Sequence, residues 1–258
     1  MPNQIDSRAM VGKSARIGGN VKIGAYATIG DNAKIADGCV VESFAQVLGF
    51  TELGANSHIF SYAVIGSAPQ DLKYRGERSY LVIGKNNILR EFVTIHPGTQ
   101  KDSRTFVGDD NLFMAYAHVG HDCAIGSGNI FANNATLAGH VDVGDKVVIG
   151  GLSAAHQFCR LGDCSIVGGC SKVVQDIPPY SMCDGHPASV RGLNSVGLRR
   201  AGFSSTVISE LKKAFKILFF EDHAAGKARE LVKEKVAPLA EVQKLLDFVS
   251  SSRRGISR

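Results

Sequence analysis

Aliphatic side chains recur at every sixth position over most of the first 173 residues. The first run starts at Val11 and continues without a break to Ile65. The period resumes over 83–95 and again over 107–173, which gives 25 hexads in three registers. A period of six fits neither an amphipathic helix nor a long alternating strand. It predicts short strands separated by tight turns, each strand pointing one aliphatic side chain inward.

Stacked repeats of this kind predict a solenoid. Three hexads form one triangular coil, and the coils stack into parallel sheets on three faces around a thin core. Turn segments such as Gly30-Asp31-Asn32 accept the backbone angles that sharp corners need. We therefore predict a mainly β fold, a parallel β-helix over residues 1–193. Its register breaks predict loop excursions near 67–82 and 100–106.

The pattern changes to helical spacing from Phe203 onward. One apolar stripe runs through Ile208, Leu211 and Phe215, and Pro238 opens a further apolar segment. Residues 194–258 are therefore predicted to form a small C-terminal helical domain of two or three helices. Such a domain could cap the open edge of the last coil or pack on a neighbour.

Charge differs between these two parts of the chain, whose formal net charge is +5. Residues 1–193 carry 16 Lys and Arg against 17 Asp and Glu, whereas residues 194–258 carry 13 against 7. The basic C-terminal part suits an acidic partner or a phosphate-bearing ligand, and equally a solvated helix face. Nothing in the pattern indicates a nucleic-acid partner.

No apolar run is long enough to span a membrane, and the N-terminal residues lack the apolar core of a signal peptide. We therefore predict no transmembrane segment and a cytoplasmic location. The six cysteines form no C-x-x-C pair, so they are predicted to be small buried residues rather than disulfides.

Four of the eight histidines fall close together in the repeat. Hexads 18 residues apart share a face, which predicts His121, His140 and His156 on one face, with His118 at the corner leading into it. Such a cluster suits a general base, because imidazole titrates near neutrality, or a metal site of three imidazoles. Asp122 could stabilise the His121 imidazolium or be a solvated turn residue.

The first register break, from Ser67 to Glu77, is polar and leaves the solenoid. Loops on rigid scaffolds often carry binding groups, although a tolerated insertion has the same sequence character.

Four segments of the chain resemble one enzyme family. These are Pro69-Gln70-Asp71-Leu72-Lys73-Tyr74, His118-Val119-Gly120-His121-Asp122-Cys123, Asn133-Asn134-Ala135-Thr136-Leu137-Ala138-Gly139-His140 and Ala155-His156-Gln157-Phe158. Together they are similar to the acyl-carrier-protein–UDP-N-acetylglucosamine O-acyltransferases of lipid A biosynthesis, which belong to the hexapeptide-repeat acyltransferases. The resemblance covers the whole chain. It implies a left-handed β-helix, a homotrimer with active sites between subunits, and transfer of an (R)-3-hydroxyacyl chain from acyl carrier protein to the glucosamine 3-hydroxyl.

The same resemblance implies a role for each site residue. His121 would be the general base, Asp122 would support its imidazolium, and the backbone N–H of Gly139 would hold the oxyanion. No metal and no cofactor are implied beyond the phosphopantetheine of the acyl carrier protein. Sugar or acyl contacts are implied for Gln70, Asp71, Lys73, His118, His140, His156 and Gln157, nucleotide contacts for Asn194 and Arg200, and a limit on acyl length for Gly169.

The sequence is also compatible with two other functions. One is a zinc enzyme of the carbonic-anhydrase type that uses three of the histidines on the same fold. Another is a sibling hexapeptide N-acyltransferase or acetyltransferase. Within the resembled family, Val196 and Ala201 replace an acidic residue and a second arginine that are frequent there, and His186-Pro187 also departs from the common pattern. These departures leave open whether the acceptor is the ordinary sugar nucleotide or its 3-amino analogue.

Overall fold

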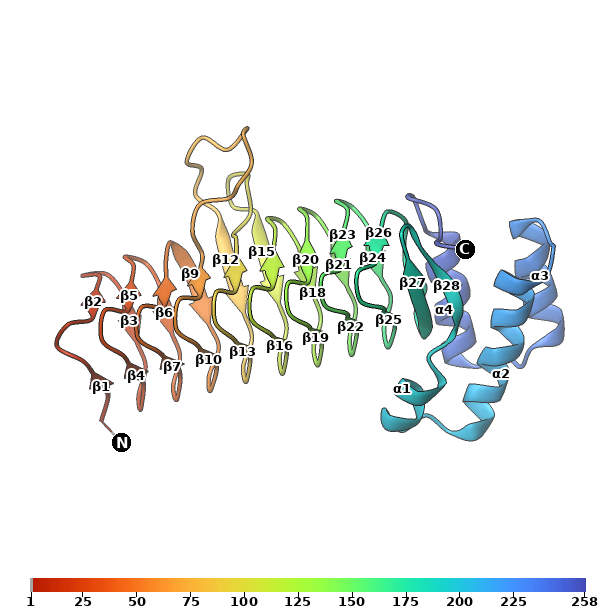
Figure 1. Cartoon of the computed structure of the whole chain (residues 1–258), viewed down its shortest axis with the longest axis horizontal. Helices are drawn as coiled ribbons and strands as arrows, with labels where there is room; N and C mark the ends of the chain where they lie inside the picture. The colour runs from red at the N-terminus through yellow and green to blue at the C-terminus, as the bar shows by residue number, and fades with distance from the viewer. Residues whose placement is uncertain (1) are drawn as a thin grey trace.

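The computed structural model describes residues 2–258, which form a three-sided solenoid that ends in a group of helices (Figure 1). The strands form three sheets of 11, 9 and 8 strands, called here sheets A, B and C. Successive strands visit the three sheets in turn, so strands three apart in sequence are neighbours. All neighbouring pairs are parallel except the last pair of sheet A. The period of six thus produces the predicted coils.

The strand bounds follow the hexads. Sheet A contains β1 (Gln4–Ile5), β4 (Lys22–Ile23), β7 (Val40–Val41), β10 (His58–Ile59), β13 (Ile88–Leu89), β16 (Leu112–Phe113), β19 (Ile130–Phe131), β22 (Val148–Ile149), β25 (Ile166–Val167), β27 (Ser181–Gly185) and β28 (Ala188–Leu193). Sheet B contains β2 (Met10–Val11), β5 (Thr28–Ile29), β8 (Gln46–Val47), β11 (Val64–Ile65), β14 (Thr94–Ile95), β17 (His118–Val119), β20 (Thr136–Leu137), β23 (Ala154–Ala155) and β26 (Lys172–Val173). Sheet C contains β3 (Arg16–Ile17), β6 (Lys34–Ile35), β9 (Phe50–Leu53), β12 (Tyr80–Ile83), β15 (Arg104–Val107), β18 (Ala124–Ile125), β21 (Asp142–Val143) and β24 (Arg160–Leu161).

The core is a column of aliphatic side chains inside the coils. In a typical two-residue strand the second side chain points inward, as Ile29 and Leu137 do, and the first points outward. Val11 is 38% exposed because it belongs to the open first coil. Burial of this column stabilises the stack, and backbone hydrogen bonds between successive coils, such as that from Gly120 N to Leu137 O, keep the strands in register.

From Asn20 onward, each tight corner between consecutive two-residue strands places one residue in the left-handed region. Asp122 and His140 have φ of 57° and 58°, and each lies at the corner between sheets B and C. That corner line, called here the B–C edge, continues through the successive coils. Each tight corner turns the chain into the next sheet, where the following strand pairs with the strand of the preceding coil.

Two excursions leave the solenoid, and both leave from the B–C edge. Residues 66–79 connect β11 to β12, and residues 96–103 connect β14 to β15. The excursions end earlier than predicted, because β12 and β15 have four residues and pair in sheet C from Tyr80 and Arg104 onward. Figure 1 shows the longer excursion projecting from the side of the solenoid.

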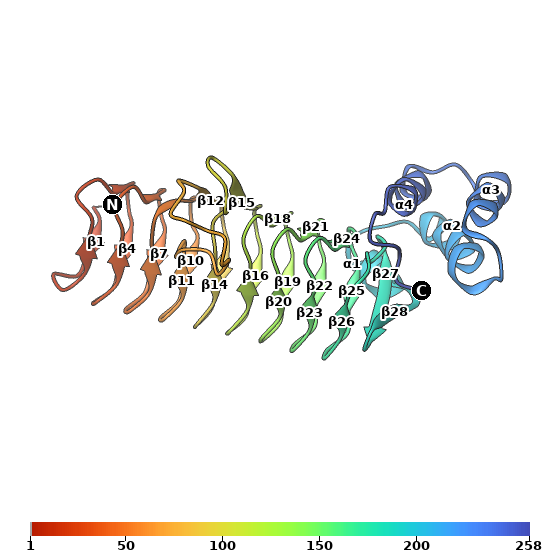
Figure 2. The ribbon, with the colours of Figure 1, turned by 90° about the horizontal axis from the view of Figure 1, so that it is seen from above.

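The last coil is closed by a hairpin that the hexads did not predict. Strand β27 pairs with β25 in parallel and with β28 in antiparallel fashion. The helices follow at this end of the molecule (Figure 2). They are α1 (Ser195–Arg200), α2 (Ser205–Phe215), a π-helical turn η1 (Lys216–Phe220), α3 (Ala225–Lys235) and α4 (Ala240–Ser250). This is a larger number of helices than the two or three predicted.

Helix α4 contacts the solenoid through sheet C. The Arg160 guanidinium lies 4.3 Å from the ring centroid of Phe248, and Lys244 forms an ion pair with Asp163. Among residues 2–258, no helix has both the length and the apolar character that crossing a membrane requires.

Candidate active site

The histidine cluster lies on the B–C edge rather than on a sheet face. His121 and Asp122 form the corner after β17, and Gly139 and His140 form the equivalent corner one coil later. His118 lies in β17 itself, on sheet B. The prediction of His121, His140 and His156 on a sheet face, with His118 at the corner, is therefore wrong: His118 lies on the face and the other three lie at corners. The reason is that the aliphatic residue of each hexad ends its strand, so the residues after it turn the corner.

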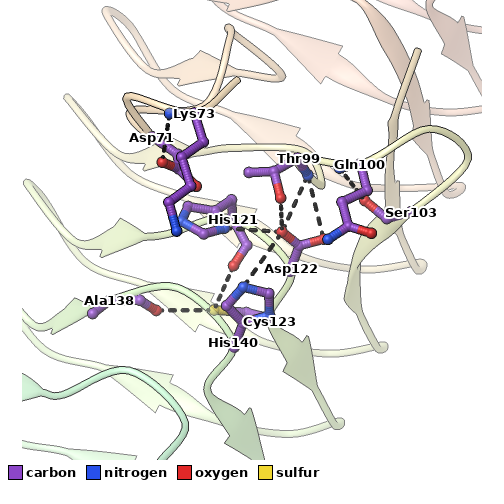
Figure 3. A network of polar contacts seen from close by, with 10 residues as sticks. All are labelled: Asp71, Lys73, Thr99, Gln100, Ser103, His121, Asp122, Cys123, Ala138 and His140. Carbon is purple, nitrogen blue, oxygen red and sulfur yellow. Dashed lines mark hydrogen bonds and ion pairs between the residues drawn. The ribbon is translucent and has the colours of Figure 1, made fainter. Parts of the chain in front are cut away.

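His121 and Asp122 form a hydrogen-bonded pair (Figure 3). The distance from His121 Nδ1 to Asp122 Oδ2 is 2.9 Å, and the two side chains are only 17% and 11% exposed. An ionised carboxylate only accepts hydrogen bonds, so Nδ1 is the donor. In the neutral ring the proton therefore sits on Nδ1, and Nε2 carries a free lone pair. This is the tautomer that a general base at Nε2 requires.

Asp122 is held from its other side by the second excursion. The Thr99 hydroxyl donates to Oδ2 at 2.7 Å, and the Thr99 backbone N–H donates to the same oxygen at 3.1 Å. Burial alone would raise the pKa of Asp122, but the hydrogen bonds from Thr99 and His121 outweigh it and hold that pKa below its ordinary value. The carboxylate is therefore charged near neutral pH. Sequence reasoning missed Thr99, which directly precedes the predicted excursion of residues 100–106.

Gly139 lies directly against the His121 ring. A methyl group at this position would come within 2.5 Å of Cε1 and 2.6 Å of Nε2 of His121. A residue with a side chain cannot stand here without displacing the ring. Within residues 2–258 the N–H of Gly139 donates to no backbone or side-chain acceptor. Gly139 thus lies beside the nitrogen that carries the lone pair, and its own amide N–H is not used by another group of the described residues.

His140 completes the cluster next to this pair. Its ring is perpendicular to that of His121, with centroids 5.1 Å apart, and it stacks on Phe158 at 4.8 Å. His140 Nε2 lies 3.9 Å from Asp122 Oδ2. Phe158 is a second residue that sequence reasoning missed, since its motif drew attention to His156 and Gln157.

A metal ion is the other ligand that this cluster could bind. Ligand atoms of His121, Asp122 and His140 all lie within 4.8 Å of one another. The structure brings together two imidazoles and a carboxylate, whereas the zinc hypothesis used three imidazoles. An ion held by the Asp122 oxygen would compete with the hydrogen bonds from His121 and Thr99. The donor set therefore favours a proton-transfer pair over a metal centre.

His118 is a neighbour of a different kind. Its Nδ1 lies 2.7 Å from Thr94 Oγ1, and its ring lies 5.4 Å from that of the buried His96. Burial, with a smaller contribution from His96, lowers the pKa of His118 from 6.5 to about 4. His118 is therefore neutral in the folded protein under ordinary conditions.

This lowered pKa predicts acid sensitivity. As pH falls from about 6.5 to about 4 the unfolded chain takes up a proton at residue 118 before the folded chain does, so stability is lost over that window. The free energy at stake is at most about 3 kcal/mol. We expect the melting temperature of His118→Gln to fall less than that of the wild type between these pH values. Equal losses in both proteins would contradict this assignment.

The first excursion supplies further predicted residues. Asp71 Oδ1 accepts the backbone N–H of Lys73 at 2.9 Å, and Gln70 is exposed. In Figure 3 the side chain of Lys73 extends toward the His121 ring. Leu72, between them, is 94% exposed. Both excursions leave from the B–C edge, which explains how a loop distant in sequence reaches this corner.

The remaining predicted residues are spread over the last coils. His156 and Gln157 lie at the next corner of the B–C edge, and the exposed His156 has its Nδ1 3.2 Å from Gln157 O. Gly169 lies at the corner between sheets A and B instead.

Asn194 caps helix α1, where its side chain accepts from Gly197 N and donates to Cys164 O, and Arg200 ends that helix. Cys164 belongs to the corner between sheets C and A, so Asn194 lies on a different edge from His121. A single chain therefore does not gather Gly169, Asn194 and Arg200 around His121.

Comparison with known proteins identifies relatives over most of the chain. A family model described as UDP N-acetylglucosamine O-acyltransferase, domain 2, matches residues 176–257, and a bacterial transferase hexapeptide model matches residues 104–139. An acyl-[acyl-carrier-protein]–UDP-N-acetylglucosamine O-acyltransferase of Thiobacillus denitrificans is 47% identical over 78% of this chain and 78% of its own. The protein of that name in Burkholderia orbicola is 46% identical over 80% of each chain.

Solved structures agree with these relatives. LpxA of Acinetobacter baumannii is 42% identical with a TM-score of 0.95, covering 98% of this chain and 99% of its own. LpxA of Bacteroides fragilis, a UDP-N-acetylglucosamine acyltransferase, is 38% identical with a TM-score of 0.96, covering 99% and 100%. The predicted left-handed parallel β-helix with a small helical region is confirmed. The chain belongs to the acyl-[acyl-carrier-protein]–UDP-N-acetylglucosamine O-acyltransferase family.

Proposed function

We propose that this protein transfers an (R)-3-hydroxyacyl chain from acyl carrier protein to the 3-hydroxyl of UDP-N-acetylglucosamine, the first step of lipid A biosynthesis. The observation that carries the proposal is His121, whose Nδ1 is bound to Asp122 while Nε2 stays free beside Gly139. The names of the relatives support the donor and the acceptor. The basic C-terminal part supports docking of an acidic carrier protein.

The proposed chemistry is direct acyl transfer. His121 Nε2 takes the proton of the sugar hydroxyl while the hydroxyl oxygen attacks the thioester carbon. Asp122 stabilises the imidazolium that forms. The N–H of Gly139 donates to the oxyanion. Collapse of the resulting tetrahedral intermediate breaks the carbon–sulfur bond. His121 then returns the proton to the leaving phosphopantetheine thiolate. No covalent enzyme intermediate is needed, and burial raises the pKa of the nearby Cys123 thiol to about 12.

The other predicted residues receive binding roles in this proposal. Lys73, Asp71 and Gln70 approach the substrate from the first excursion, and His118, His140, His156 and Gln157 bind sugar or acyl groups. Gly169 limits the acyl chain, and Asn194 and Arg200 bind on the nucleotide side. Because these last three lie on other parts of the chain, we propose that a neighbouring subunit completes each site.

A homotrimer is the assembly that we propose for this purpose. The outward positions of sheet A are apolar at Val40, Ile88, Leu112, Ile130, Val148 and Ile166, and Ile88 is 41% exposed. Sheet C presents the charged Arg16, Lys34, Glu52, Asp142 and Arg160 in addition to the apolar Val82, Phe106 and Ala124, so its outward face is more mixed. An apolar face of this extent is typical of an interface between permanent partners. A sedimentation mass of about three times 27.4 kDa supports the trimer, and the mass of one chain would contradict it.

The cytoplasmic location stays a prediction.

The test of the function is the identity of the product. Purified protein is incubated with acyl carrier proteins that carry 3-hydroxyacyl chains of different lengths, and with UDP-N-acetylglucosamine or its 3-amino analogue. We expect the first acceptor to gain one acyl group by mass, through an ester that mild alkali cleaves. An alkali-stable amide as the main product would favour the amino analogue. Transfer from acyl-coenzyme A alone would favour a sibling acetyltransferase.

Gly169→Met should shorten the preferred acyl chain. A methyl group at Gly169 has the Gly151 carbonyl oxygen as its nearest neighbour, at 3.4 Å, so a longer side chain fits there without disturbing the corner. Such a side chain would fill space equivalent to several methylenes, each worth about 0.8 kcal/mol of binding. Competition between carrier proteins with short and long chains measures the shift. An unchanged preference would place the end of the acyl groove elsewhere.

A further inference from the structure

The second excursion, residues 96–103, is built against the carboxylate of Asp122. Thr99 alone makes three contacts with it: the N–H lies 3.3 Å from Oδ1 and 3.1 Å from Oδ2, and the hydroxyl lies 2.7 Å from Oδ2. Figure 3 shows Thr99 and His121 meeting the same carboxylate. Oδ2 therefore accepts both the Thr99 hydroxyl and the His121 ring N–H.

Burial makes these contacts matter. The Asp122 side chain is 11% exposed, so water supplies few of the donors that an ionised carboxylate requires. A carboxylate with free oxygens could also rotate, and the oxygen facing His121 Nδ1 would then change. With Thr99 fixing both oxygens, the carboxylate has one orientation, and the acceptor for His121 stays in place.

The excursion that carries Thr99 is itself anchored. Gln100 N donates to Ser103 Oγ at 3.0 Å, which closes the turn, and Gly98 N donates to Tyr80 O at 3.3 Å. Asp102 pairs with Arg78 at 3.0 Å. Arg78 belongs to the first excursion, so the loop that holds Asp122 is tied to the loop that carries Lys73. Thr99 is thus held on a fixed support rather than on a free loop.

We propose that Thr99 is a positioning residue for acyl transfer, holding the Asp122 carboxylate charged and directed at His121 Nδ1. The inference rests on the proposed role of His121 as the base. Thr99 acts through Asp122, so it should influence the rate of the chemical step more than the binding of either substrate.

Thr99→Val tests this directly, because it removes the hydroxyl while keeping the shape and the backbone N–H. We expect kcat to fall by about tenfold, which corresponds to about 1.4 kcal/mol, while KM for the sugar nucleotide changes less than twofold. Thr99→Ser retains a hydroxyl and should recover most of kcat. Thr105→Val is the matched control: Thr105 is buried in β15, and its hydroxyl has no hydrogen-bond partner within residues 2–258. Its kcat should stay at the wild-type value.

The outcomes separate this inference from the proposed function. If Thr99→Val keeps wild-type kcat while His121→Ala is inactive, the positioning role is wrong and the base assignment stands. A fall that appears only in KM would likewise overturn positioning in favour of substrate contact. If Thr99→Val does not fold, Thr99→Ala removes the same hydroxyl with less bulk, and the kcat criterion is applied to it. If Thr99→Ala is also unfolded while Thr99→Ser is normal, Thr99 is structural and the inference is wrong.

Discussion

His121→Ala is expected to lose nearly all turnover while keeping the fold and the binding of both substrates. A sugar hydroxyl is a poor nucleophile while it keeps its proton, and the free Nε2 of His121 is the base that removes it. Loss of a general base typically costs 10²–10⁴-fold in rate, which is about 3–5 kcal/mol in activation free energy. The measurement is kcat for product formation, with binding of UDP-N-acetylglucosamine followed by calorimetry.

His223→Ala is the control for this experiment. His223 also pairs with a carboxylate, at 3.1 Å from Glu221, but it belongs to the helical region beyond η1. Its kcat should match the wild type. The base assignment fails if His121→Ala keeps a tenth or more of wild-type kcat.

Gly139→Ala should reduce kcat by about a hundredfold without unfolding the protein. The new methyl group would come within 2.5 Å of the His121 ring, which is the movable end of a side chain and therefore yields. A displacement of about 1 Å from the reactive geometry is enough for a loss of this size. Because alanine keeps the backbone N–H, the loss reports the position of His121 rather than the loss of an oxyanion donor.

Gly19→Ala is the matched control for that substitution. Gly19 is the residue before the left-handed Asn20, as Gly139 is before His140. A methyl group at Gly19 would have its nearest neighbour at 3.8 Å, so nothing must move. We expect wild-type kcat for this control. Normal activity in Gly139→Ala would show that the ring has room that the geometry does not give it.

The hexads predicted the solenoid because each aliphatic position has one physical use, the core. A six-residue period with turn residues between allows few structures other than stacked coils. The hairpin β27–β28 escaped prediction because Met182 and Cys183 alternate between exposed and buried without any period of six. Similarly, Tyr80 and Arg104 extend their strands ahead of the aliphatic position. The division into domains at residue 193 stays a prediction.

The site was predictable where neighbours in sequence are also neighbours in space. His121 and Asp122 are adjacent, so their pairing could be inferred from the motif. The contacts of Thr99 and of Gly139 with this pair depend on how coils and excursions stack, which no spacing rule supplies. The capping role of Asn194 was also predictable, because asparagine is a common N-cap residue. In the structure Asn194 caps helix α1.

Acyl transfer by metal-stripped protein tests the central claim, a histidine–aspartate base without a metal ion. The wild-type protein is treated with a strong chelator, freed of it, and assayed for transfer from acyl carrier protein to UDP-N-acetylglucosamine, with and without added zinc. The ligand atoms of His121, Asp122 and His140 lie close enough to hold an ion. The measurement therefore distinguishes a proton-transfer pair from a metal centre at the same residues. We expect the same kcat before and after treatment. Loss of activity that zinc restores would contradict it.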